Sequence, residues 1–168
     1  MNLLTSFFGR PKQPSPDEFG QALFGVALDR TNTLNGELES MGVLARFPEV
    51  QQSKQYLMQL TIFAMAPLDQ LLAETPSPAL ERTRDAMRLA FTQKFRIQTP
   101  SPGDLVLDAL FRAYAQAALS EDVLRLGQLA TEAVGLDDAD AEVLLLNSYT
   151  AALDSYLPVI SQFDLDSR

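Results

Sequence analysis

The chain has 168 residues, 46% of them apolar, and contains no histidine, cysteine or tryptophan. This length and composition suit one globular domain, and they exclude disulfides, Ser–His or Cys–His catalytic pairs, and the zinc, copper and haem sites that depend on His or Cys. The net charge of −9 lies entirely beyond residue 100, where twelve acidic residues stand against three basic ones.

Residues 1–16 predict an amphipathic peptide followed by a proline-rich linker. We expect the peptide to dock on the body of the protein or to be disordered. The alternatives are a weak anchor to a membrane surface through residues 1–10, a ligand for a partner groove, or an interface for a homo-oligomer. The apolar side chains that would share its helical face are Leu3, Leu4, Phe7 and Phe8.

The first long helix is predicted from Asp17 to about Ser40, with Asn35–Gly36 as an open question because this pair can split it in two. The next helix is expected to begin at Pro48 and to end near Ala73. Its segment Tyr56–Leu68 is apolar nearly all round, which predicts a central helix buried by the others. Pro67 predicts a kink or break near residues 63–67.

Three further helices are predicted before the last one, each introduced by a Ser, Pro or Asp signal. Ser77 and Pro78 begin a helix that runs to about Ile97, and its five scattered cations favour pairing with acids inside the molecule over nucleic-acid binding. The next helix is expected over 104–119. Ser120 is expected to cap a helix that ends at Gly135.

The last helix is predicted to be capped by Asp137 or Asp138 and to end at Pro158, which leaves residues 161–168 as a polar tail. The sequence therefore predicts an all-α domain over residues 17–160. It would contain five to six helices, packed as antiparallel hairpins in an irregular bundle around the central buried helix.

Residues 105–153 resemble a tetratricopeptide hairpin followed by the first helix of another unit. The resemblance rests on Ala133, the Gly135-Leu136-Asp137 turn and the helix start at 139–142. Leu126 departs from the pattern, because such repeats have a small residue at that position, and Gly127 stands beside it. The resemblance implies tetratricopeptide-like stacking in the C-terminal part and a surface that binds peptides.

The C-terminal acids are the main functional signal. Most of them fall in the first turns of predicted helices, where anions offset the positive end of the helix dipole by about 0.3–1 kcal/mol each. They do not match a calcium loop, because Val143 and Tyr149 stand where glycine and glutamate are needed. The candidate partner-binding residues are Asp104, Asp108, Glu121, Asp122, Asp137, Asp138, Asp140 and Glu142.

We therefore predict a cytoplasmic, non-catalytic interaction module (an adaptor, inhibitor or assembly factor) that presents an acidic helical face to a basic protein partner. No cofactor, metal, nucleic acid or membrane span is expected. One alternative is a helical carrier of a small apolar ligand or lipid, with methionines and phenylalanines lining its cavity. The other alternative is a carboxylate-only enzyme, for which Asp108 and Glu132 are the candidates.

Overall fold

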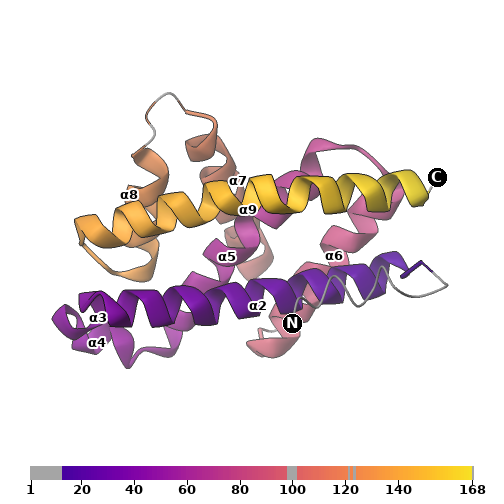
Figure 1. The fold of residues 1–168 in the computed structure, drawn as a ribbon. Coiled ribbons are helices and arrows are strands. Elements are labelled where there is room, and N and C mark those ends of the chain that lie inside the picture. Colours follow the sequence, from indigo (N-terminus) through magenta and orange to yellow (C-terminus); the bar gives the residue numbers. More distant parts are fainter. Residues whose placement is uncertain (1–12, 98–101, 121, 123, 168) are drawn as a thin grey trace.

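The structure is a computed structural model that describes residues 13–97, 102–120, 122 and 124–167, with the side chains of helix α7 described from residue 106 onward. The described residues form eight helices and no strand, which confirms the predicted all-α class (Figure 1). The helices are α2 (Pro16–Ser40), α3 (Val43–Arg46), α4 (Pro48–Gln51), α5 (Lys54–Glu74), α6 (Pro78–Lys94), α7 (Pro102–Ala118), α8 (Arg125–Val134) and α9 (Ala139–Asp166).

Helix α2 begins at a complete capping box. The Ser15 hydroxyl accepts from the Glu18 amide, and the Glu18 carboxylate accepts from the Ser15 amide at 2.8 Å. This arrangement satisfies two backbone donors that the first turn would otherwise leave unpaired. The helix is continuous through Asn35–Gly36, so this pair does not split it, and the left-handed Gly42 follows its end.

Helix α5 is the buried central helix that the sequence predicts, and every residue from Leu60 to Leu72 is buried. It packs against α2, α6, α7, α8 and α9. Pro67 does not break it, because tertiary packing on all sides holds the helix together around the one missing backbone donor. At the other end Tyr56 is buried but Leu57 is exposed, so the predicted burial of Tyr56–Leu68 is continuous only from Leu60 onward.

The prediction that this helix begins at Pro48 is wrong. Pro48 instead begins the four-residue helix α4, and α5 begins six residues later. Phe47, restrained by the following proline, is not helical and separates α4 from α3. Ser53 is extended, and its hydroxyl accepts from the Gln55 amide at 3.2 Å to cap α5. These two short helices account for the excess over the predicted five to six.

The long helices α2 and α9 lie antiparallel on either side of α5 (Figure 1). Near the start of α2, the Phe19 ring stacks on Phe163 near the end of α9, with ring centroids 4.2 Å apart. Farther along, Arg30 Nη2 donates to the carbonyl of Ser148 at 2.5 Å. The first and last long helices of the described chain are therefore joined directly.

Helix α9 continues through Pro158 to Asp166, so the predicted helix end at Pro158 is wrong. Residues 161–166 belong to the helical body and not to a polar tail, because Ile160 and Phe163 are buried beyond the proline. Pro158 is exposed on the helix surface, where the carbonyl of Asp154 that lacks its usual donor can bond to water. Burial of the apolar residues therefore outweighs the loss of one backbone hydrogen bond.

Helix α8 also differs from the prediction, since it begins at Arg125 and not after a Ser120 cap. The Ser120 hydroxyl donates to the carbonyl of Ala117 at 2.9 Å, which closes the end of α7. Asp122 Oδ1 accepts from the Leu124 amide at 3.1 Å and shapes the approach to α8. Both side chains thus bond locally within the connection.

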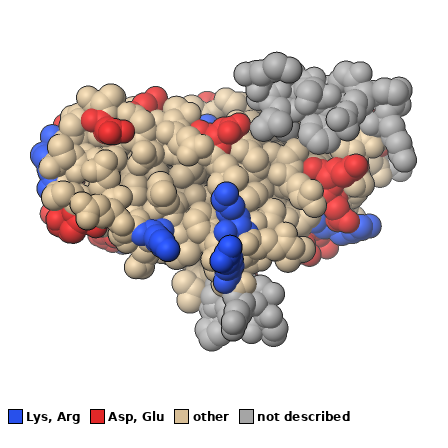
Figure 2. Space-filling model, turned by 90° about the horizontal axis from the view of Figure 1, so that it is seen from below, with Lys and Arg blue, Asp and Glu red and all other residues tan. Residues whose placement is uncertain are grey.

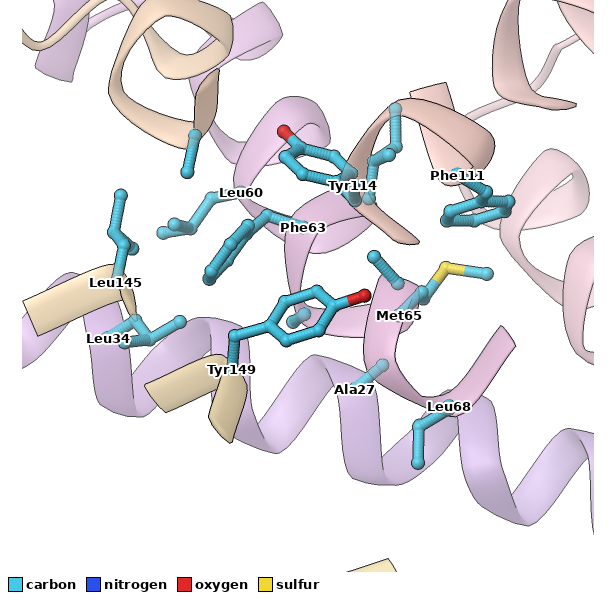
Figure 3. Close-up of a cluster of buried hydrophobic side chains, with 14 of the residues drawn as sticks. Ala27, Leu34, Leu60, Phe63, Met65, Leu68, Phe111, Tyr114, Leu145 and Tyr149 are labelled. Atoms are coloured by element: carbon cyan, nitrogen blue, oxygen red, sulfur yellow. The ribbon is translucent and has the colours of Figure 1, made fainter. Parts of the chain in front are cut away.

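The core is centred on aromatic rings that α5 shares with α7 and α9 (Figure 3). Phe63 of α5 lies 5.5 Å from the Tyr114 ring of α7 and 5.8 Å from the Tyr149 ring of α9, measured between centroids. All three side chains are at most 1% exposed. These contacts join α7 and α9 to α5, and α8 packs against all three helices, which positions the turn between α8 and α9.

By length and composition, α9 among the described helices could cross a membrane, with a mean hydropathy of 1.2 over an 18-residue window of which 22% is buried. This is weak evidence by itself. Asp154 lies near the middle of the helix, where a carboxylate would cost about 2.5–3.5 kcal/mol at the centre of a bilayer. The absence of a membrane span stays a prediction.

The predicted docking peptide with Leu3, Leu4, Phe7 and Phe8 lies outside the described residues.

Candidate partner-binding site

The turn from α8 to α9 is fixed by two caps. Gly135 has a φ of +80°, which is favourable for glycine, and it lets the Leu136 amide donate back to the carbonyl of Thr131 at 2.9 Å. Asp138 begins α9, and its Oδ1 accepts from the amides of Asp140 and Ala141 at 3.0 and 3.1 Å. Of the two candidate caps that the sequence offered, the structure selects Asp138.

Gly127 allows the two helices to approach closely. A Cβ atom at this position would lie 2.7 Å from the carbonyl oxygen of Glu142, which is closer than real contacts allow. The small residue of the α8–α9 contact is therefore Gly127 and not Leu126. This contact holds the first turn of α9, with its acidic residues, against the side of α8.

Two neighbouring grooves lie at this turn. The first, which we call the acidic groove, has a volume of about 590 Å³ and is lined by Glu132 of α8, Asp137 of the turn and Glu142 of α9. The second, the tyrosine groove, has a volume of about 330 Å³ and is lined by Tyr56 together with Glu49 and Glu132. Glu132 borders both, and the described residues that line them include no Lys or Arg.

The tyrosine groove contains a buried hydroxyl. Tyr56 is 3% exposed, and its hydroxyl oxygen has no hydrogen-bond partner among the described residues. Burial raises the pKa of Tyr56 to about 12, so the phenol is neutral at physiological pH. A neutral phenol can both donate and accept a hydrogen bond, and here neither capacity is used within the described chain.

Arg46 of α3 pairs with two of the acids beside the grooves. Its Nε donates to Asp138 Oδ2 at 3.0 Å, and its Nη2 lies 3.7 Å from Asp140 Oδ2. Burial acts to raise the pKa of Asp138, but the hydrogen bond and charge of Arg46, with the amides of Ala141 and Asp140, outweigh it and hold this pKa below its usual range. Asp138 is therefore structural, whereas the grooves take their charge from neighbouring acids.

The predicted partner-binding acids separate into two groups. Four of them meet at the α8–α9 turn, namely Asp137, Asp138, Asp140 and Glu142. Asp108 lies elsewhere, on α7 beside Arg88 of α6, and Asp122 shapes the connection before α8. The side chain of Asp104 and the whole of Glu121 lie outside the described residues. Glu49 and Glu132 were not among the predicted binding residues, although both lie at the grooves.

A buried ionic network lies where α5, α6 and α7 meet, and its central acid, Asp69, was not predicted from the sequence. Asp69 of α5 is 2% exposed and receives two hydrogen bonds from each of two arginines of α6. Arg84 bonds it at 2.9 Å through both Nε and Nη2, and Arg88 at 2.8 Å through Nε and 3.1 Å through Nη2. Such paired bonds offset much of the cost of burying a charge.

Arg88 extends this network to α7. Its Nη1 donates to Asp108, and its guanidinium carbon lies 5.0 Å from the centre of the Phe111 ring. Burial acts to lower the pKa of Arg88, but Asp69 and Asp108 outweigh it and raise this pKa. Burial likewise acts to raise the pKa of Asp108, while Arg88 and the more distant arginines lower it overall. The network therefore joins three helices, and the pKa shifts of Arg88 and Asp108 both favour their charged forms.

The face shown in Figure 2 is mostly uncharged and carries separate acidic and basic side chains. A groove of about 510 Å³ between α2 and α6 is lined by Asp17 and Asp85 but also by Arg82, and Arg82 lies 3.3 Å from Asp17. The grooves at the α8–α9 turn differ, because all of their charged lining residues among those described are acidic.

Among the described residues, no group of three or more carboxylates is placed to hold a metal ion. The tetratricopeptide resemblance of residues 105–153 stays a prediction. Comparison with known proteins finds no family model, no curated protein and no solved structure that matches this chain.

Proposed function

We propose that the protein is a non-catalytic interaction module that binds a basic segment of a protein partner at the α8–α9 turn. The observation that carries this proposal is the lining of the acidic groove, where Glu132, Asp137 and Glu142 surround one volume of about 590 Å³ with no cation among its described lining residues. Carboxylates that share a concave surface concentrate their field there and attract cations.

One further feature supports a basic partner. The adjoining tyrosine groove offers the unpartnered hydroxyl of Tyr56 beside Glu49 and Glu132. A lysine or arginine side chain needs several acceptors when it leaves water, and these groups supply them.

The carboxylate-only enzyme receives less support. Asp108, one of its two candidate residues, is paired with Arg88, and its pKa lies below the usual range of an aspartate. A general acid or base near neutral pH needs a pKa shifted in the opposite direction. Glu132, the other candidate, is exposed and lies in the acidic groove away from the Asp108 network.

The proposal can be tested with a random-sequence peptide library, because the partner is defined only by its chemistry. Peptides selected on the full chain should be enriched in Lys and Arg, and their affinity should fall as salt is raised. The combined change Glu132→Gln, Asp137→Asn and Glu142→Gln should raise the Kd of the selected peptides by about tenfold or more, as expected when several exposed charge pairs are lost.

The matched control is the combined change Asp29→Asn, Glu81→Gln and Asp154→Asn. It removes the same net charge from exposed positions on α2, α6 and α9 away from the groove. Its Kd should stay within about twofold of the wild-type value, as expected for distant exposed charges. Selected peptides that are neutral, or that lose equal affinity with both sets of changes, would show that the acidic groove is not the binding site.

A further inference from the structure

One side of α9 carries apolar residues that the described helices leave partly open. Val143 and Leu157 are 52% and 51% exposed, and Leu146 and Leu153 between them are half-buried. With Thr150 they form a line spaced alternately three and four residues apart, which we call the α9 seam (Val143, Leu146, Thr150, Leu153 and Leu157). This is the spacing by which one helix packs along another. At about 1.5 Å per residue, the seam is about 21 Å long.

Thr150 is the polar member of the seam, and its hydroxyl already donates to the carbonyl of Leu146 at 2.9 Å. Covering a hydroxyl whose donor is satisfied costs less than covering one that must give up a bond to water. The open seam contributes to the low buried share, 22%, of the 18-residue apolar window of α9. Neighbouring apolar side chains that stay exposed are typical of a surface that binds another protein.

The seam begins beside the acidic groove. Glu142, which lines that groove, directly precedes Val143 and lies one turn before Leu146 on the same side of the helix. Helix α9 itself contains no Lys or Arg. An occupant that follows the seam toward the start of α9 therefore meets apolar side chains first and carboxylates next.

The chemistry of this surface selects a helix with a basic end. An extended peptide would bury backbone groups without partners, because the described residues contain no strand to pair with, whereas a helix bonds its own backbone. An anionic membrane surface would be repelled by the carboxylates of the groove. The α9 helix of a second copy would bring no cation to them.

We propose that the α9 seam and the acidic groove together bind an amphipathic helix of a protein partner. Its apolar stripe packs along the seam, and Lys or Arg in its last turn enters the groove. Cations are favoured at the C-terminal end of a helix, so the partner helix runs antiparallel to α9. Covering the seam takes a helix of at least about fifteen residues. The inference rests on the proposed function, because it specifies which kind of segment carries the basic residues.

Two synthetic peptides of about three heptads test the inference on the full-length protein. The striped peptide has leucines at heptad spacing, lysines in its last turn, and alanine and glutamine elsewhere. The scrambled peptide has the same composition and the same lysines, but its leucines are spread around the helix. Both are used below the concentration at which they self-associate. The striped peptide should bind at least about tenfold more tightly and should shift the methyl NMR signals of Val143 and Leu157.

The variants are placed at exposed residues, so that the core stays intact. The combined change Val143→Ser and Leu157→Ser should weaken binding of the striped peptide by about tenfold and change that of the scrambled peptide by less than about twofold. The matched control is Leu89→Ser with Leu165→Ser, which removes exposed leucines from α6 and from α9 outside the seam. It should leave both affinities unchanged.

Two results overturn the inference while binding at the groove remains: equal affinity of the two peptides for the wild-type protein, or seam changes that do not affect the striped peptide. The first comparison does not depend on any variant folding. The combined change of Glu132, Asp137 and Glu142 described above should weaken both peptides, because both carry the lysines. If it weakens neither, the proposed function itself fails, and the inference fails with it.

Discussion

At the scale of single residues, two tyrosines in the same cluster differ in their hydroxyl groups. Tyr149 donates to Gln70 Oε1 at 2.8 Å, whereas the buried Tyr114 hydroxyl has no partner among the described residues, and the two hydroxyls point in different directions (Figure 3). Burial raises the pKa of both phenols, so both are neutral at physiological pH. The same chemical change should therefore have different effects at the two positions.

Tyr149→Phe should lower the free energy of unfolding by about 1–3 kcal/mol, because it leaves the buried acceptor of Gln70 without a donor. Tyr114→Phe should be neutral or stabilise the protein by up to about 1 kcal/mol, because it removes a hydroxyl whose burial is not compensated. Urea unfolding of the two variants measures the difference. Equal losses would mean that the hydroxyl of Tyr114 has a bonding partner.

The pairing of Asp108 with Arg88 predicts a pH dependence. The folded pKa of Asp108 lies below its value in the unfolded chain, which is about 3.9. A lowered folded pKa contributes stability that is present above the unfolded pKa and is lost as the pH falls through the folded one. The contribution should therefore be complete at pH 7 and should shrink from about pH 5 downward.

Asp108→Asn should reduce the free energy of unfolding at pH 7 by roughly 0.5–1 kcal/mol, because this carboxylate is about one-third exposed and partly screened by solvent. The difference between the variant and the wild type should shrink as the pH is lowered from about 5 toward 2. Chemical unfolding at both pH values tests this, with Asp154→Asn on the exposed face of α9 as the control. A loss that is the same at both pH values would contradict an ionic origin.

At the scale of elements, two glycines within α2 predict opposite effects. A Cβ at Gly20 would lie 2.4 Å from the carbonyl oxygen of Thr83 on α6, whereas a Cβ at Gly36 meets nothing within 4 Å. Gly20→Ala should destabilise the protein by about 1–3 kcal/mol through forced separation of the helices. Gly36→Ala should stabilise it by about 0.5–1 kcal/mol through helix propensity. Thermal unfolding of both variants should show midpoints that move in opposite directions.

Local signals predicted most of the elements, and they failed where packing decided the outcome. Ser77 and Asp138 precede helices as predicted, although the Ser77 side chain makes no capping hydrogen bond, and the cap at Ser15 was not predicted. Pro158 was expected to end α9, but the burial of Phe163 beyond it keeps the chain helical, and a sequence pattern does not show which neighbour will cover that ring. Ser120 likewise resembles a cap in sequence, yet it closes the helix before it.

The buried Asp69 shows how far the polar contacts of the interior can be predicted from the sequence. In sequence it is one acid beside an apolar run, and the two arginines that bind it lie fifteen and nineteen residues later on a different helix. The scattered cations of α6 were expected to pair with acids inside the molecule, and Arg84 and Arg88 do so. Which acid they reach depends on how α6 packs against α5, and the sequence does not show how far apart residues on these two helices lie.

At the scale of the whole molecule, part of the acidic excess in the C-terminal sequence lies at one surface, the two grooves of the α8–α9 turn. The net charge lies beyond residue 100, but Asp108 is paired with Arg88 and Asp138 with Arg46. Fewer acidic residues are therefore available to a partner than the sequence suggests. The sequence predicted Asp137 and Glu142, and the fold adds Glu132 and Glu49 from other elements. The partner-binding role of these acids stays a prediction.

The contact between α2 and α9 predicts that the end of the last helix matters for overall stability. Phe163→Ala should lower the free energy of unfolding by about 3–5 kcal/mol, because the ring is 2% exposed and stacks on Phe19. Leu165→Ala, two residues later and 64% exposed, should change it by less than about 0.5 kcal/mol. Unfolding by denaturant compares the two variants, and a small effect of Phe163→Ala would indicate that the end of α9 is a dispensable tail.

The joined ends of α2 and α9 have a practical consequence. Gln13 Nε2 donates to Ser167 Oγ at 3.2 Å, so two points separated by 154 positions in the chain are neighbours in space. A circular permutant that links these points with a short peptide and opens the chain between α7 and α8 would keep every described helix, α2 to α9, intact. It would also place new termini well away from the linker, which offers two distant sites for attaching probes to one folded protein.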